Sequence, residues 1–237
     1  MLGVTHAASG MLVGLATLPW AITGPWWVQA GWVVVCGGAA VLPDLDQPGS
    51  MVARMWGPLT GALAAGVSRL AGGHRAGTHD ALLAPLVVGL LAWGASWWLP
   101  SFAVVVAVTV GLTLRVTVLG RAGVAVWVTN LVGSGWAGWV LAQQPSMIAY
   151  GHLWLPIALM LGVWAHQLGD LITPEGLPVP VWGLVHRQRR VALGLFRTGS
   201  SVERVVVGPV LAVAVAVLGC YRFGLGSPLV EALRRLA

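Results

Sequence analysis

The chain has 237 residues, of which 57% are hydrophobic and 8% are charged. Soluble globular domains carry about 25% charged residues, and disordered chains combine high charge with low hydrophobicity, so this composition excludes both classes. The formal net charge of +6 comes from 13 arginines. The class that remains is an integral membrane protein, with the lipid bilayer around it. Membrane proteins concentrate arginine in short cytoplasmic loops, so the positive charge is expected without a nucleic-acid partner.

Seven apolar stretches approach the length of about 20 residues that a membrane-spanning helix needs. In chain order they cover residues 2–22, 26–42, 79–99, 102–119, 122–142, 152–172 and 205–221. The segment 47–73 is less apolar and contains Pro58, which indicates a short interfacial or re-entrant helix between the second and third spans. The sequence therefore predicts an all-α fold, a polytopic transmembrane helical bundle of about seven spans, as one integral membrane domain over residues 1–237.

The arginines predict the direction of these spans. The connections 23–25, 100–101 and 143–151 carry no charge, whereas the loops that alternate with them carry arginines. Because cytoplasmic loops are enriched in arginine, we expect these loops and the amino-terminal end in the cytoplasm of a multi-pass inner-membrane protein. The expected parts are a motif-bearing region at about 1–183, an arginine-rich cytoplasmic loop at 184–204, and a last span and tail at 205–237. The arginines in the tail leave its side of the membrane open.

The first polar motif follows the second apolar stretch and reads LPDLDQPGS at residues 42–50. An extended chain would direct Asp44 and Asp46 to the same side, as two carboxylates that share a cation require. The alternative is an Asp-Pro-Gly turn that ends the span with local side-chain caps. The motif alone favours the turn.

The second motif lies just before the third apolar stretch and reads HRAGTHD at residues 74–80. Two imidazoles, a guanidinium and a carboxylate within seven positions suit a hydrolytic metal site, in which Arg75 would grip a phosphate or carboxylate. The alternative is helix initiation, with Thr78 as the cap and Asp80 at the positive end of the helix. Helix initiation explains neither His74 nor His79, so this motif favours a functional site.

The third motif ends the sixth apolar stretch and reads HQLGD at residues 166–170. Positions four apart share a helix face, so His166 and Asp170 would bind one ion together, or Asp170 would orient His166 as its hydrogen-bond partner. The alternative is a buried hydrogen bond between the two side chains without a ligand. A histidine with a carboxylate one turn away is uncommon in a membrane span, so this motif also indicates function.

The predicted topology brings the three motifs, together with His6 of the first stretch, to the cytoplasmic ends of the spans. Three aspartates, four histidines and one arginine that are distant in the sequence would then meet on one side of the membrane. Unpaired carboxylates near hydrocarbon would cost about 2.5–3.5 kcal/mol each. A cation offsets their repulsion, so a divalent metal ion is the expected partner.

This set of motifs resembles the YdjM-like family of membrane-bound, predicted metal-dependent hydrolases. The resemblance covers the first three quarters of the chain and rests on Thr5-His6, Pro43-Asp44-Leu45-Asp46 with Ser50, His74-Arg75 with Thr78-His79, and His166 to Asp170 with Leu171, Ile172, Thr173 and Gly176. By this resemblance, the positions expected to bind metal are His6, Asp44, Asp46, His74, His79, His166 and Asp170.

The hypothesis is therefore a membrane hydrolase with one or two divalent ions, zinc or manganese, that acts on an ester or phosphoester of a small or lipid-linked substrate. The spacing of His166 and Asp170 is also similar to zinc-dependent phospholipases C, which favours a phosphoester. Arg75 is expected to hold the substrate anion, and Asp80 to act as the base or to orient it. Ser50, Thr78 and Thr173 belong to the same motifs and are expected to be accessory residues.

The chain departs from the family pattern at three positions. Gln47 stands where the family usually has histidine, and Ala76 and Asp80 replace the usual glycine and serine. These departures keep a non-catalytic metal-binding scaffold open as an alternative. A transporter is the third hypothesis, and it is less favoured because the spans hold few charged residues.

Overall fold

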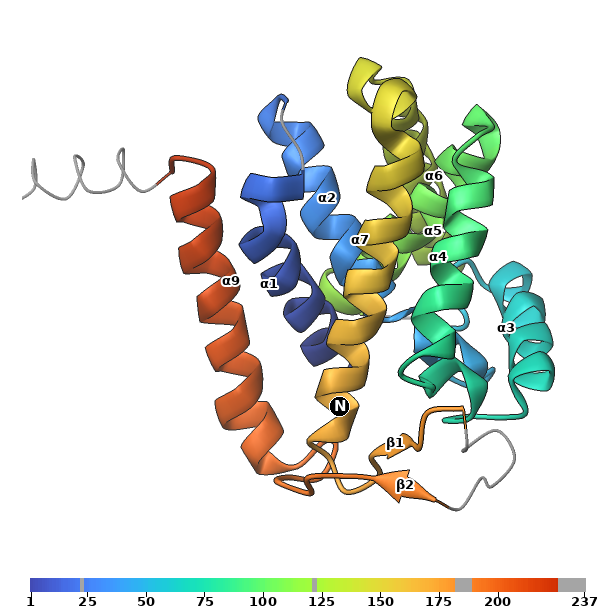
Figure 1. Cartoon of the computed structure of the whole chain (residues 1–237), viewed down its shortest axis with the longest axis vertical. Coiled ribbons are helices and arrows are strands. Elements are labelled where there is room, and N and C mark those ends of the chain that lie inside the picture. Colours follow the sequence, from blue (N-terminus) through green and yellow to red (C-terminus); the bar gives the residue numbers. More distant parts are fainter. Residues whose placement is uncertain (22–23, 121–122, 182–188, 226–237) are drawn as a thin grey trace, which may run out of the picture.

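The computed structural model describes residues 1–21, 24–120, 123–181 and 189–225, and the described part is mostly helical (Figure 1). Helices suit so apolar a chain because each helix satisfies its own backbone hydrogen bonds without water. The long helices are α1 (Gly3–Ala21), α2 (Trp26–Ala39), α4 (Leu83–Ala95), α5 (Leu99–Thr117), α6 (Val124–Ala142), α7 (Pro145–Leu171) and α9 (Gly208–Arg222). Residues 184–188 of the predicted arginine-rich loop and residues 226–237 of the predicted tail lie outside the described residues.

Four helices in the described ranges are long and apolar enough to cross a membrane. They are α5, α6, α7 and the continuous helix Glu203–Arg222 that contains α9. Each of the other predicted stretches also contains a helix, but α2 and α4 have only 14 and 13 residues. The helical membrane architecture is therefore present, and the count of seven spans stays a prediction.

Two predicted boundaries differ from the structure. The uncharged connection 143–151 is mostly helix, because α7 begins at Pro145. Proline is well tolerated at the first helical position, where its missing N–H has no helical partner to lose. The third span, predicted to start at His79, starts as α4 at Leu83, because residues 77–79 form a short 3₁₀ turn instead.

Helix α2 lies in the middle of the bundle and contacts α1, α5 and α7. Its side chains Trp32, Val35 and Cys36 are fully or almost fully buried. Glycine makes the crossing with α5 close, since a Cβ at Gly38 would collide with the carbonyl oxygen of Thr109. Small residues allow this approach between membrane helices, which lack a hydrophobic drive to associate. The packing fixes the end of α2, where the first polar motif begins.

The short elements gather at one end of the bundle, together with the amino terminus (Figure 1). They are the 3₁₀ turns η1 (Leu42–Asp46) and η2 (Gly77–His79), helix α3 (Pro58–Ala71), strands β1 (Leu177–Pro178) and β2 (Arg190–Val191), and the π-helical turn Glu203–Val207. The strands are antiparallel, with Leu177 opposite Val191. Helix α3 falls in the segment predicted to be interfacial, and its place relative to a membrane stays a prediction.

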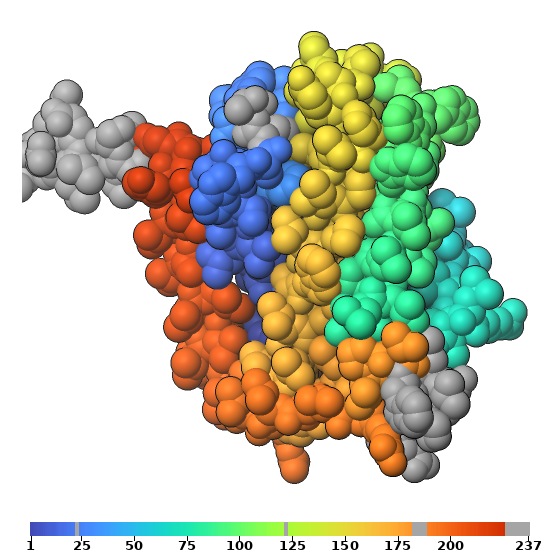
Figure 2. All heavy atoms as spheres, viewed as in Figure 1, coloured from blue at the N-terminus to red at the C-terminus, as the bar shows by residue number. Residues whose placement is uncertain are grey.

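Helix α9 leans on α1 at the edge of the bundle, and none of its residues is buried. Figure 2 shows that the described residues between α7 and α9, 172–181 and 189–207, lie at the end of the bundle where α7 ends. This segment therefore covers the end of the molecule at which the polar motifs lie.

Candidate metal centre

The first motif leaves α2 as a 3₁₀ turn, not as the extended chain that would direct both aspartates to one side. Pro43 at the start of the turn favours this tight helical geometry. Residues two apart in a 3₁₀ turn point in different directions. Asp44, whose side chain is 20% exposed, consequently faces His79, whereas the fully buried Asp46 faces the loop that carries His74.

Asp46 organises the HRAGTHD loop through both carboxylate oxygens. Oδ1 lies 2.6 Å from Nδ1 of His74, and Oδ2 accepts hydrogen bonds from the Arg75 N–H (3.0 Å) and the Thr78 hydroxyl (2.5 Å). Thr78, which the helix-initiation alternative would make a cap, thus holds the aspartate instead. Burial alone would raise the pKa of the Asp46 carboxyl, but the hydrogen bonds from His74, His79 and Thr78 hold that pKa well below its usual range.

His79 is fully buried and presents its two ring nitrogens to different partners. Its Nδ1 lies 3.0 Å from the Thr78 hydroxyl and 3.5 Å from Oδ2 of Asp46. Its Nε2 lies 3.1 Å from Nε2 of His166. Burial lowers the pKa of the His79 imidazole, which favours the neutral form that binds metals.

Helix α7 supplies His166 and Asp170 one turn apart, and both side chains are fully buried. Nδ1 of His166 lies 2.9 Å from the carbonyl oxygen of Ala40, the residue that caps α2. A proton on Nδ1 satisfies this carbonyl and leaves the Nε2 lone pair free, as in metal-bound histidines. The Ala40 carbonyl therefore orients His166, a role that a sequence motif cannot reveal because every residue has a carbonyl.

The atoms at the centre of this arrangement fit a metal ion. Oδ2 of Asp170 lies 3.5 Å from Nε2 of His79 and 3.5 Å from Nε2 of His166, and it is buried without a hydrogen bond. Oδ1 of Asp44 lies 4.0 Å from Nε2 of His79. Two ligands on a tetrahedral zinc ion, at bonds of about 2.0–2.1 Å, stand about 3.3 Å apart. The donor atoms present thus match the spacing and the chemistry of such a site.

The second oxygen of Asp170, Oδ1, lies close to the α-ammonium of Met1, the imidazole of His6 and the guanidinium of Arg75. Oδ1 lies 2.8 Å from the α-ammonium of Met1 and 3.3 Å from Nε2 of His6. The His6 ring stacks on the His166 ring with centroids 3.9 Å apart. Arg75 reaches the same carboxylate, with one guanidinium nitrogen 3.2 Å from Oδ2 and the other 3.4 Å from Oδ1. Its backbone φ of +58° is unusual for a residue with a side chain.

The structure brings together all seven residues that were predicted to bind metal. They form three overlapping groups whose candidate ligand atoms lie within 4.8 Å of one another, namely His6–His166–Asp170, Asp44–His79–His166 and Asp46–His74–His79. We call these seven residues the ligand cluster. The grouping shows a buried histidine and aspartate cluster that could hold a metal ion, and the role of each member stays a prediction.

Asp80, Ser50 and Thr173 lie outside these groups in the described part of the chain. Asp80 is fully buried, and its Oδ1 accepts the N–H groups of Leu82 and Leu83 at the start of α4. Its Oδ2 accepts the N–H of Val181. Ser50 accepts the Ala53 N–H, and Thr173 donates to the carbonyl of Asp170. All three side chains thus bond to backbone groups.

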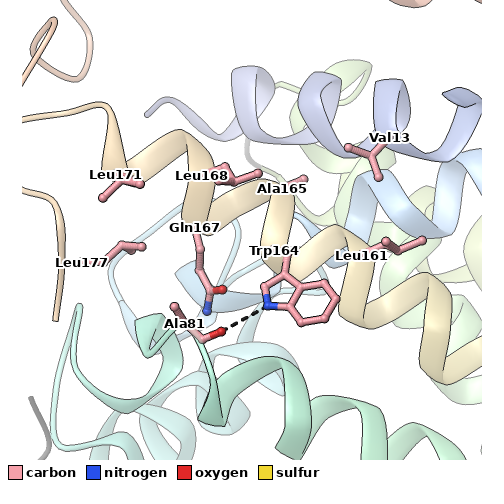
Figure 3. Close-up of a pocket in the computed structure, with 9 residues that line it drawn as sticks. All are labelled: Val13, Ala81, Leu161, Trp164, Ala165, Gln167, Leu168, Leu171 and Leu177. Carbon is pink, nitrogen blue, oxygen red and sulfur yellow. Dashed lines mark hydrogen bonds between the residues drawn. The ribbon is translucent and has the colours of Figure 1, made fainter. Parts of the chain in front are cut away.

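An apolar pocket of about 420 Å³ lies elsewhere, on another face of α7. Figure 3 shows Trp164, Leu168 and Leu171 along its wall, and Trp164 donates a hydrogen bond to the carbonyl oxygen of Ala81. Residues at this spacing share one helix face, whereas His166 and Asp170 lie on the opposite one. No member of the ligand cluster lines this pocket.

Comparison with known proteins supports the assignment that the motifs suggested. No curated protein and no solved structure matches the chain. A family model described as YdjM inner membrane protein matches residues 1–226, which is nearly the whole chain. With its apolar helices and its buried polar cluster, the chain belongs to the YdjM inner membrane protein family.

Proposed function

We propose that this protein is a metal-dependent hydrolase that acts on an ester or phosphoester at the cytoplasmic surface of the inner membrane. The observation that carries the proposal is the meeting of His79 Nε2, His166 Nε2 and Oδ2 of Asp170, which accepts no hydrogen bond, in a buried site. The Met1 α-ammonium and Arg75 balance the charge of Asp170, but neither contact uses the two imidazole Nε2 atoms, which face each other and Oδ2 as the ligands of one ion would. We therefore assign them to the ion.

In this proposal Asp44, His79, His166 and Asp170 hold one divalent ion, zinc or manganese. When bound, the ion supplies Lewis acidity and an activated water for attack on the substrate. His6 stacks on His166 and contacts Asp170, so it supports two of the proposed ligands. The 20% exposure of the Asp44 side chain supports an opening to the surrounding water at this point.

We assign Asp46 a positioning role, because three donors of the HRAGTHD loop already lie on its oxygens. One of these donors, His74, is 35% exposed and is the most accessible imidazole of the ligand cluster. With Nδ1 held by Asp46, the other ring nitrogen of His74 is available to carry a proton to or from the substrate. His74 replaces Asp80 as the proposed proton-transfer group, since Asp80 is occupied by three backbone N–H groups.

Arg75 keeps its proposed role as the group that binds the substrate anion. In the structure it is paired with Asp170 at 3.2 Å, and 15% of its side chain is exposed. An ion bound to Asp170 would compete for that carboxylate. The guanidinium would then be available to a phosphate or carboxylate, which it binds in a bidentate manner.

The proposed setting is a single membrane domain in which α1 and the shorter helices α2 and α4 cross the bilayer together with α5, α6, α7 and the helix Glu203–Arg222. Short helices cross when the bilayer thins or when flanking residues reach the interface. The arginine-bearing loops place the ligand cluster on the cytoplasmic side by the positive-inside rule. A small or lipid-linked substrate would approach from that surface, where α3 would lie along the interface.

The direct test is hydrolysis by the detergent-purified protein loaded with zinc or manganese, on a panel of phosphomonoesters, phosphodiesters, carboxylic esters and phospholipids. We expect turnover of one class and its loss in His79→Ala, with no loss in His152→Ala, which removes a histidine that stacks on Trp97 outside the ligand cluster. A fully metal-loaded protein that turns over no member of the panel would favour the scaffold alternative.

A further inference from the structure

Glu203 is a fully buried acid that the proposed reaction does not use. It begins the π-helical turn before α9, far in sequence from the polar motifs. Its Oε1 accepts the N–H of Leu2 at 2.6 Å, and its Oε2 accepts the N–H of Gly199 at 2.7 Å. A carboxylate that accepts two backbone N–H groups makes charge-assisted hydrogen bonds, which are about twice as strong as neutral ones.

The bond to Leu2 connects Glu203 to the ligand cluster in one further step. The carbonyl oxygen of Leu2 accepts the N–H groups of Thr5 (2.9 Å) and His6 (3.0 Å) in the first turn of α1. The N–H of Leu2 thus donates to Glu203, and the carbonyl oxygen of Leu2 accepts the N–H of His6. The His6 ring then contacts Asp170 and stacks on His166.

The bond to Gly199 fixes Glu203 itself. The chain before Gly199 is fastened to the end of α7, because the N–H groups of Leu193 and Leu195 donate to the carbonyls of Leu171 and Ile172, both at 2.8 Å. The last carbonyls of a helix lack partners inside the helix, so these bonds complete α7 just after Asp170. Glu203 is therefore held in a fixed place relative to the helix that carries His166.

From this chain of contacts we propose that Glu203 is a positioning residue of the metal centre, which sets His6 against Asp170 and His166 through the backbone of Leu2. The inference rests on the proposed metal centre. It extends that centre from the motif-bearing part of the chain to the segment before α9. Partners of this indirect kind commonly change metal affinity by about 10- to 100-fold.

The test is a Zn²⁺ titration of the full-length, detergent-purified protein in competition with a chromophoric chelator. We expect Glu203→Ala to weaken Zn²⁺ binding about 10-fold or more, while the stoichiometry and the gel-filtration profile remain those of the wild type. Gln143→Ala, which removes an exposed side chain that donates to the carbonyl oxygen of Trp139 outside the ligand cluster, is the control and should leave the affinity unchanged. Glu203→Gln keeps one acceptor oxygen and serves in place of the alanine variant if that protein does not fold.

A double-mutant cycle separates positioning of His6 from a general effect on the fold. If Glu203 acts through His6, the Glu203 substitution should cause no further loss of Zn²⁺ affinity in a His6→Ala background. An unchanged affinity in the Glu203 variants, or an equal loss with and without His6, would overturn the inference. A wild-type protein that binds no Zn²⁺ would instead refute the proposed metal centre, so the two failures are distinguishable.

Discussion

Replacing Asp46 with asparagine tests the division of the ligand cluster into ligands and positioning groups. Asparagine keeps one acceptor oxygen, but its NH₂ group cannot accept the bonds that Oδ2 accepts from the Arg75 N–H and the Thr78 hydroxyl. Hydrogen bonds to a charged group contribute about 1.5–3 kcal/mol each. The loss of these two bonds therefore removes up to about 3–6 kcal/mol of loop stabilisation. The substitution also weakens the 3.5 Å contact between Oδ2 and Nδ1 of His79, which orients that ring.

Because Asp46 is assigned to orientation and not to coordination, Asp46→Asn should weaken Zn²⁺ binding by about 10- to 100-fold and leave the stoichiometry intact. The assay is the chelator competition titration, with Asp170→Asn as the comparison that removes a proposed ligand and should abolish stoichiometric binding. Thr78→Val, which removes one of the two bonds to Oδ2, should have a smaller effect in the same direction. Wild-type affinity in Asp46→Asn would refute the positioning role, and complete loss of the ion would make Asp46 a ligand.

Three further predictions follow from other contacts. Asp80→Ala should lower the melting temperature, because it removes the acceptor of the first N–H groups of α4 and with it about 1 kcal/mol or more of the free energy of unfolding. The Zn²⁺ stoichiometry should stay unchanged, and loss of the ion would show that Asp80 belongs to the reactive groups. The pKa of Asp46 lies well below its usual range, so its stabilisation is complete above about pH 4 and disappears only as the pH falls through that lower pKa. The difference in melting temperature between the wild-type apoprotein and Asp46→Asn should therefore stay constant from pH 7 to about pH 4 and begin to narrow towards pH 3, and a difference that narrows above about pH 5 would contradict this. For the topology test, single cysteines are introduced at Gly73 and at Trp97 in a background without Cys36 and Cys220. A membrane-impermeant maleimide should label one of these cysteines in inverted vesicles and the other in right-side-out vesicles. Labelling of both from the same side would contradict the proposed topology.

The ligand cluster could be predicted from the sequence because polar residues are rare in this chain. With seven acidic residues in 237, each aspartate in an apolar setting needs a partner, and the arginine pattern placed the motifs at one end of the spans. The pairing of His166 with Asp170 could likewise be predicted from the sequence, because helical periodicity puts positions four apart on one face.

The roles inside the cluster depend on contacts that no local pattern encodes. Asp80 reads as a reactive carboxylate in its motif, but it is occupied in part by Val181, which is 101 residues away. Asp44 and Asp46 point to different partners because the chain forms a 3₁₀ turn. A sequence with aspartate, proline and glycine is compatible with such a turn and with an extended chain, so it does not predict which one forms. The only sequence signal for Glu203 was an acid directly before an apolar stretch, and its partner Leu2 is 201 residues away.

The most direct test of the account is the metal content of the purified protein, measured by elemental analysis of the wild type beside Asp44→Ala, His166→Ala and His152→Ala, each shown to be monodisperse. Asp44 and His166 lie on separate elements and meet only in the folded site, whereas His152 lies against Trp97. We expect about one zinc or manganese ion per chain in the wild type and in His152→Ala, and loss of the ion in the other two variants. A wild-type protein without a stoichiometric ion after reloading, or variants that all retain it, would contradict the central claim that these distant residues form one metal centre.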